Sequence, residues 1–358
     1  MNYDELLKKL VADGVSDIHF KVGRPPLVRV NGLLKHLKDA ETLRPEDTDD
    51  MAKFFLSEAM FAKFQKNLEA DSSYSIKDVS RFRVNVFRQR GSISLILRII
   101  PNKIPTLEEL GLPPVVQTLL DAQRGLILVT GVTGSGKSST LAAMVDGINE
   151  RQPSHIITIE DPIEFLHRDK RGSINQREIG IDTDSFSTAF ISSLRQDPDV
   201  IMVGELRDTT TMETALRAAE TGHLVLSTLH TSDAKETINR IVDFFPTHQQ
   251  KQIRIQLAAS LNAVISQRLI SRIDGGRALA CEIMIVNAAI RDYILDPNKL
   301  SEIRTNMAKG REQYGSQTFD QALLELLHQG IITEKEALMN ATSSNDLKLK
   351  LTMNNDFY

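Results

Sequence analysis

A glycine-rich stretch is the part of the sequence best suited to do chemistry. Residues 131–138 match the pattern G-x-x-x-x-G-K-[ST] throughout. Glycines at this spacing let backbone N–H groups turn inward around phosphate groups, and the helix that follows adds its positive dipole end. We expect Lys137 to reach the β- and γ-phosphates and the Ser138 hydroxyl to ligate Mg²⁺. The residues predicted to bind the nucleotide are Gly131, Thr133, Gly134, Ser135, Gly136, Lys137, Ser138 and Ser139.

A cluster of acids follows the next apolar run, residues 155–159. It consists of Glu160, Asp161 and Glu164. The carboxyl ends of parallel strands meet at one edge of a sheet, where ligands bind in this architecture. One of these acids is therefore expected to orient or deprotonate the attacking water, and the residues by themselves leave open which one.

A second acidic position is Glu205, which follows the apolar run Val200–Val203. An acid at the end of such a strand is expected near Mg²⁺. Gly204 stands where the usual aspartate of this motif would be, so Glu205 is expected to act on the metal through water. The alternative interpretation of either acidic group is that its residues lie in an ordinary solvated loop after a strand and take no part in catalysis.

Histidines and arginines offer further contacts to a γ-phosphate. His230 ends the apolar run 224–228 at the same predicted sheet edge, where it would either touch the nucleotide or serve a structural role. His223, before that run, is a weaker candidate. In the N-terminal part, Arg83 shares one strand face with its alternating neighbours, and Arg98 lies in the next strand. They form either a solvated basic face or arginine fingers supplied across a domain or subunit junction. The alternation of residues along the strand does not by itself select these two arginines over Arg81 or Arg88.

The elements that would position these residues fall into two parts. Residues 1–100 read as an α+β unit, with a helix over 3–12, a hairpin turn at Asn31-Gly32, and paired strands over 81–89 and 92–100. Residues 101–114 contain three prolines and are predicted to be a linker. From 115 to 287, short apolar runs alternate with helical stretches, which predicts an α/β fold with a parallel sheet covered by helices on both faces. Residues 288–358 are predicted to be helical.

Composition excludes several classes of protein. The 358 residues carry a net charge of −4, which gives no reason to expect nonspecific nucleic-acid binding. Cys281 is the single cysteine, so no intrachain disulfide or cysteine-based zinc site can form. The sequence shows neither a signal peptide nor an apolar run of the ~20 residues that span a bilayer, so attachment to a membrane would need a partner.

The motifs together resemble the PilT/PilU family of type IV pilus retraction ATPases, within the secretion ATPase superfamily. The resemblance runs over essentially the whole chain, in residues 16–20, 81–85, 158–164, 197–205, 218–223 and 228–231. It implies a PAS-like N-terminal domain, a RecA-like P-loop core and a helical C-terminal extension. It also implies a homohexameric ring that uses ATP and Mg²⁺, lies in the cytoplasm and docks on an inner-membrane pilus platform protein.

The resemblance also assigns roles to individual residues. Glu164 matches the general base of the family's Asp box, and Arg83 and Arg98 match the N-domain arginines that approach the γ-phosphate. The family's C-terminal retraction motif is matched only at Ala289-Ile290-Arg291, and Pro297 is expected to end that helix early. Three interpretations stay open: a main retraction motor, an accessory PilU-like ATPase that works with a paralogous motor, or a divergent paralogue. A secretion or pilus-assembly ATPase would share the core, but such proteins usually carry extra N-terminal domains and a four-cysteine zinc insertion.

Overall fold

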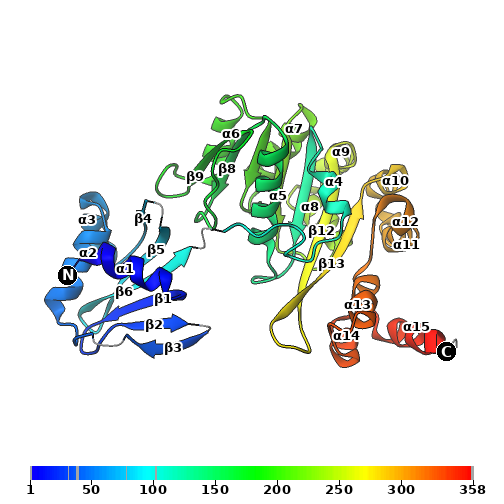
Figure 1. Ribbon diagram of the computed structural model, residues 1–358. Helices are drawn as coiled ribbons and strands as arrows, with labels where there is room; N and C mark the ends of the chain where they lie inside the picture. The colour runs from blue at the N-terminus through cyan, green and yellow to red at the C-terminus, as the bar shows by residue number, and fades with distance from the viewer. Residues whose placement is uncertain (1, 31, 38–39, 78, 101–102, 356–358) are drawn as a thin grey trace. The chain divides into compact units, whose positions relative to one another are not determined.

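The chain folds as two units (Figure 1). The computed structural model describes residues 2–30, 32–37, 40–77, 79–100 and 103–355. Residues Met1–Lys103 with Glu164–Leu166 make up the first unit, and Ile104–Ile163 with His167–Tyr358 make up the second. None of the helices in these described ranges is long and apolar enough to cross a membrane.

An antiparallel sheet forms the centre of the first unit. Its six described strands are ordered β3-β2-β1-β6-β5-β4. Apolar side chains of the three helices complete a core around Phe20 and Phe82, both of them fully buried. The elements are α1 (Tyr3–Ala12), β1 (Val15–Lys21), β2 (Leu27–Val30), β3 (Leu33–His36), α2 (Pro45–Phe55), α3 (Glu58–Asn67), β4 (Glu69–Ile76), β5 (Ser80–Gln89) and β6 (Ser92–Ile100).

The predicted elements of this unit are present. The helix over residues 3–12 and both strands of the later hairpin are found, with β5 beginning one residue early. Val30 pairs with Leu33, so the first hairpin turns where expected; Gly32 has φ +79°, and Asn31 lies outside the described residues.

A parallel sheet forms the centre of the second unit. Its seven described strands are ordered β13-β12-β7-β11-β10-β8-β9, and β13 alone among them runs antiparallel to its neighbour. The strands are β7 (Gly125–Thr130), β8 (His155–Glu160), β9 (Ser173–Glu178), β10 (Val200–Val203), β11 (Leu224–Leu229), β12 (Leu261–Ser271) and β13 (Arg277–Ile285). Every residue of β7, β10 and β11 is buried, as expected for parallel strands covered on both faces.

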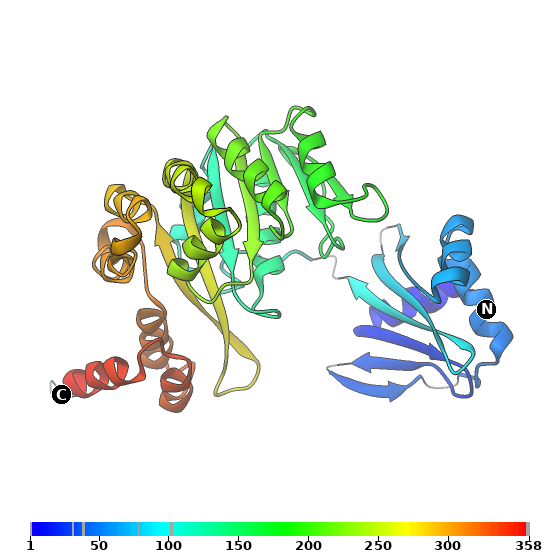
Figure 2. The same cartoon turned by 180° about the vertical axis from the view of Figure 1, so that it is seen from behind.

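Helices pack on each face of this sheet. One core lies under α4 (Val115–Leu119) and α5 (Lys137–Arg151) and takes in Leu107 and Leu112 of the predicted linker. The other core lies under the helices seen from behind in Figure 2, which are α6 (Phe186–Ser193), α7 (Thr209–Glu220), α8 (Ala234–Asp243) and α9 (Thr247–Ser260). The prediction of helices on both faces is therefore confirmed.

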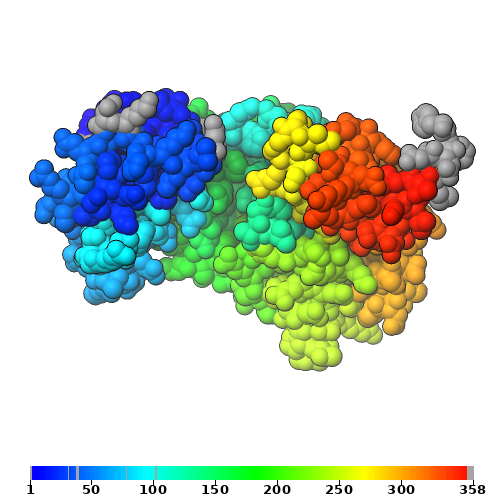
Figure 3. All heavy atoms as spheres, turned by 90° about the horizontal axis from the view of Figure 1, so that it is seen from below, coloured from blue at the N-terminus to red at the C-terminus, as the bar shows by residue number. Residues whose placement is uncertain are grey.

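The C-terminal part is helical, as predicted. Its helices are α10 (Ala288–Leu295), η1 (Pro297–Lys299), α11 (Glu302–Lys309), α12 (Arg311–Tyr314), α13 (Phe319–His328), α14 (Glu334–Asn340) and α15 (Ser344–Asn355). Figure 3 shows the last three, orange to red, beside the yellow β12–β13 hairpin, with which they share an apolar cluster around Phe319. Helix α10 stops at Leu295, two residues before Pro297, so the early end of this helix is also confirmed.

Candidate functional site

The phosphate-binding loop connects β7 to α5 and bends tightly. Gly131, Gly134 and Gly136 all have positive φ, at +145°, +81° and +95°. A Cβ added to Gly131 would lie 2.5 Å from the Ser135 hydroxyl oxygen, so no larger residue fits there without displacing its neighbours. Helix α5 begins at Lys137, with Gly136 as its N-cap residue. The glycines therefore do what the sequence predicted: they fold the loop over the N-terminus of a helix.

The ammonium group of Lys137 turns back onto this loop. Its Nζ donates hydrogen bonds to the carbonyl oxygens of Gly131 (2.7 Å) and Val132 (3.1 Å). Burial lowers the pKa of Lys137, and the negative charge of Glu205 raises it in part. The fold thus brings the cation of the loop within electrostatic range of the acid at the end of β10.

A buried hydroxyl in the loop fits a phosphate group. The Ser135 hydroxyl is among the buried polar atoms of the described residues that have no hydrogen-bond partner. A hydroxyl so placed can donate to a phosphate oxygen. Ser138, in the first turn of α5, is exposed, so its hydroxyl is open to a metal ion that arrives with the phosphates.

Gln267 is a neighbour of the loop that sequence reasoning missed. It is 1% exposed on β12, and its amide donates to the hydroxyl of Thr140 on α5 (2.7 Å). A Cβ added to Gly131 would lie 2.6 Å from the backbone oxygen of Gln267, so β12 packs directly against the phosphate-binding loop. The polar stretch Ser266-Gln267-Arg268 between apolar residues of β12 was the available signal.

The first acidic cluster lies at the end of β8. Glu160 is 8% exposed and accepts a hydrogen bond from the Thr158 hydroxyl (2.6 Å), whereas Asp161 and Glu164 are exposed. Parallel pairing of β8 with β10 aligns Ile159 with Val203, which brings the carboxyl ends of both strands to the same edge.

Glu205 and His230 meet at that edge. Glu205 Oε1 lies 3.3 Å from His230 Nε2, and its other oxygen accepts a hydrogen bond from Arg207 (2.7 Å). Gly204, which precedes Glu205, lies close to β8. A Cβ on Gly204 would come 3.3 Å from the Ile159 carbonyl oxygen, a tight contact that a larger residue could make only if its neighbour moved by a few tenths of an ångström.

A hollow of about 370 Å³ opens beside this pair. Its lining includes Glu205, Arg207 and His230, with Arg240 and Phe244 at the side of α8. His223 does not belong to this edge: it precedes the first residue of β11 and its ring contacts the Ala218 carbonyl oxygen (3.1 Å). Of the two histidines, the parallel sheet groups His230 with the acids and leaves His223 at the opposite edge.

Arg83 and Arg98 lie in the first unit as direct cross-strand partners on β5 and β6. Next in the same row is Asp17, 7% exposed, which accepts a hydrogen bond from Arg98 (2.9 Å). Burial would raise the pKa of Asp17, but hydrogen bonds from Arg98 and Ser16 and the charges of Arg98 and Arg29 lower it overall. Arg83 Nε lies 4.0 Å from Asp71, on the other side. The acids on both sides offset the repulsion of two adjacent guanidinium groups.

Comparisons with known proteins match this geometry to one family. The family model described as type II/IV secretion system protein matches residues 4–347. The chain is 44% identical to the type IV pilus retraction ATPase PilT of Pseudomonas aeruginosa over 337 residues, which are 94% of this chain and 97% of that one. The chain belongs to the PilT/PilU pilus ATPases of the secretion ATPase superfamily. It is also 40% identical to the type IV pilus ATPase PilU of the same organism, over 99% of this chain and 93% of that one.

Solved structures of this family share the fold. A crystal structure of the pilus retraction motor PilT with bound ADP has a TM-score of 0.90 and 49% identity, covering 96% of this chain and 98% of that chain. The ATPase DotB of Legionella pneumophila has a TM-score of 0.81 and 28% identity, covering 94% of both chains. The mixed α/β architecture with two sheets is therefore that of a PilT-type ATPase, and such ATPases bind nucleotide.

Proposed function

We propose that this protein is a hexameric motor that hydrolyses ATP to power type IV pilus retraction, and hence twitching motility, at the cytoplasmic face of the inner membrane. The supporting observation is the near full-length similarity to PilT, combined with a phosphate loop folded over a helix N-terminus beside Glu205 and His230. In this proposal residues 1–100 are a PAS-like domain, 101–114 a linker, 115–287 a RecA-like core and 288–358 a helical extension. The ring docks on an inner-membrane platform protein.

Each site residue has a distinct role in the proposed reaction. The backbone N–H groups of the loop and Lys137 hold the β- and γ-phosphates. Ser138 would hold Mg²⁺ and Glu205 would act on it through water, and the ion would neutralise charge on the phosphates when bound. Glu164 is the general base for the attacking water. His230, bound to Glu205, senses the γ-phosphate, and Arg83 and Arg98 stabilise its charge from the N-terminal unit.

A second candidate function is that of an accessory ATPase that depends on a paralogous retraction motor. The observation in its favour is the C-terminal segment, where α10 ends at Leu295 and the retraction motif of main motors is matched only in its first three residues. The similarity to PilU over nearly the whole chain agrees with it.

Retraction of labelled pili in living cells tests the proposal. Cells that lack this chain are expected to extend pili but to lose most retraction events, and a plasmid with the wild-type chain is expected to restore them. The same plasmid with Glu164→Gln is expected to fail, because the general base is gone while binding groups remain. Retraction at the wild-type frequency and force in the cells without the chain would contradict a motor role; normal frequency with reduced force would favour the accessory role.

A further inference from the structure

Two side chains of β9 hold the backbone on either side of Glu164. The N–H group of Ile163 donates to the buried carboxylate of Glu178 (3.1 Å). The N–H group of His167 donates to the side-chain oxygen of Gln176 (2.8 Å). The short stretch between them, which carries Glu164, therefore has both of its ends fixed to the edge strand of the sheet.

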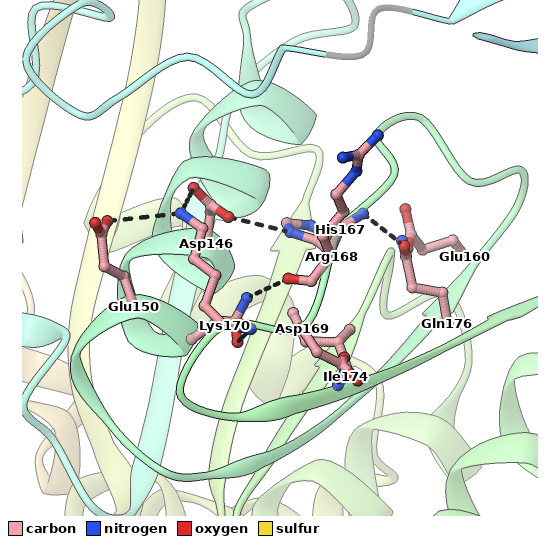
Figure 4. Close-up of polar contacts among 10 residues, drawn as sticks. Asp146, Glu150, Glu160, His167, Arg168, Asp169, Lys170, Ile174 and Gln176 are labelled. Carbon is pink, nitrogen blue, oxygen red and sulfur yellow. Dashed lines mark hydrogen bonds and ion pairs between the residues drawn. The ribbon is translucent and has the colours of Figure 1, made fainter. Parts of the chain in front are cut away.

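Gln176 also reaches the acid at the end of β8. Its Nε2 group donates to Glu160 Oε1 (3.1 Å), the same oxygen that accepts from Thr158 (2.6 Å). Figure 4 shows the amide between Glu160 and the backbone of His167. The orientation of the amide is settled by its partners, because a carboxylate requires the NH₂ group and a backbone N–H requires the oxygen.

Residues 168–170, which follow this stretch, are hydrogen-bonded to α5, the helix that begins at the phosphate-binding loop. Asn149 on α5 is fully buried; its amide donates to the Arg168 carbonyl oxygen (2.8 Å) and accepts from the Lys170 N–H (3.1 Å). Lys170 in addition pairs with Asp146 of α5 (2.9 Å), as Figure 4 shows. Glu164 is thus connected through a short, doubly anchored segment to the helix whose first turn forms the phosphate site.

We propose that Gln176 is a positioning residue for Glu164, because its amide joins Glu160 to the His167 backbone and so fixes the segment that presents the Glu164 carboxylate to the attacking water. This inference rests on the proposed function. A general base must lie within hydrogen-bond reach of the proton it takes, and a displacement of about 1 Å can cost on the order of 10²-fold in rate. A neutral amide that donates to Glu160 and accepts from the His167 N–H group can supply this support without adding a charge to the site.

Steady-state ATP turnover of the full-length protein tests the inference. Gln176→Met keeps the length of the side chain and removes the hydrogen bonds to Glu160 and to the His167 backbone. Its kcat is expected to fall roughly tenfold or more, with KM and oligomer mass unchanged. Asn175→Ala is the matched control, since Asn175 is the adjacent residue on β9 and exposed, and its turnover is expected to equal that of the wild type. If Gln176→Met does not assemble, Gln176→Glu takes its place: it loses the donor to Glu160 and is likewise expected to lower kcat.

A combined variant separates positioning from general support of the fold. Glu164→Asp keeps a carboxylate and is expected to retain a measurable rate. If Gln176 acts through Glu164, Gln176→Met in the Glu164→Asp background is expected to cost much less than in the wild type. Equal costs in both backgrounds, a change confined to KM, or a wild-type kcat in Gln176→Met would overturn the inference and leave the proposed function intact. Absence of turnover in the wild type would instead refute the proposed function, and the inference with it.

Discussion

The Lys137 ammonium group donates hydrogen bonds to carbonyl oxygens of its own phosphate-binding loop. These are the oxygens of Gly131 and Val132, so the loop is held closed by its own cation. Incoming phosphates offer stronger, charged acceptors and are expected to draw Nζ away from these neutral oxygens. The residue therefore has two tasks in sequence, to keep the loop formed and then to neutralise the phosphates.

Arg83 faces another arginine across the strands. The two-residue turn at Arg90-Gly91 sets the register of this hairpin, which pairs Arg83 with Arg98, whereas Arg81 and Arg88 face Ile100 and Ile93. Alternation along β5 places Arg81 on the same face as Arg83 and Arg88 on the opposite face, and the register that follows from the turn pairs only Arg83 with another arginine. Arg83 and Arg98 thus lie side by side in the sheet of the first unit.

Arg83→Ala is expected to preserve nucleotide affinity and to slow turnover by ~10³-fold or more, the usual effect of losing an arginine finger. The measurement is ATP turnover beside nucleotide binding in the same preparation. Arg24→Ala, which removes an exposed arginine of the same unit, is the control and should leave the rate unchanged. An equal rate for Arg83→Ala and Arg24→Ala would contradict the arginine-finger assignment and would mean that Arg83 belongs only to a solvated basic face.

At the level of elements, the loop between β8 and β9 carries a buried histidine. The His167 side chain is 1% exposed, its Nδ1 lies 3.9 Å from Asp146, and Figure 4 shows it beside that carboxylate. Burial lowers the pKa of His167 from 6.5 to about 4, although Asp146 acts against this shift. His167 is therefore neutral in the folded protein at physiological pH.

Acidification is expected to destabilise the second unit through His167. The unfolded chain takes up the proton near pH 6.5 and the folded chain only near pH 4, so stability is complete above pH 6.5 and falls as the pH approaches 4. The loss is about 2 kcal/mol at pH 5. Thermal unfolding midpoints at pH 7.5 and 5 measure it, with His167→Gln expected to lose less on acidification than the wild type. Exposed His248→Gln is the control; an identical pH response in all three proteins would contradict the assignment.

The sequence predicted some elements better than others, for physical reasons. Buried parallel strands such as β10 appear as short apolar runs, and the phosphate loop is marked by its glycines. The β12–β13 hairpin was missed because β12 starts at the residue after α9 ends, with no turn residue between them. The support from Gln176 and Gln267 was also missed. Gln176 lies only nine residues from His167, but which side chain meets which backbone group depends on the path of the loop between β8 and β9, whereas Gln267 contacts Thr140 of α5 across 127 residues of chain.

At the level of the whole molecule, the proposed site draws on two units. The second unit alone holds the loop, Glu205 and His230, whereas both arginines belong to the first. Among the described residues, no cluster of three or more His, Cys, Asp or Glu side chains could hold a metal ion. The proposed activity therefore requires residues of both units.

ATP turnover of the purified full-length protein, with and without Mg²⁺ and with oligomer mass recorded in the same samples, tests the central claim most directly. The wild type is expected to hydrolyse ATP as a hexamer only when Mg²⁺ is present. Lys137→Ala is expected to abolish turnover, because the phosphates lose their cation, while Lys335→Ala, at an exposed position of α14, keeps it. Normal turnover in Lys137→Ala, or no turnover in the wild type with Mg²⁺, would contradict the assignment of this site.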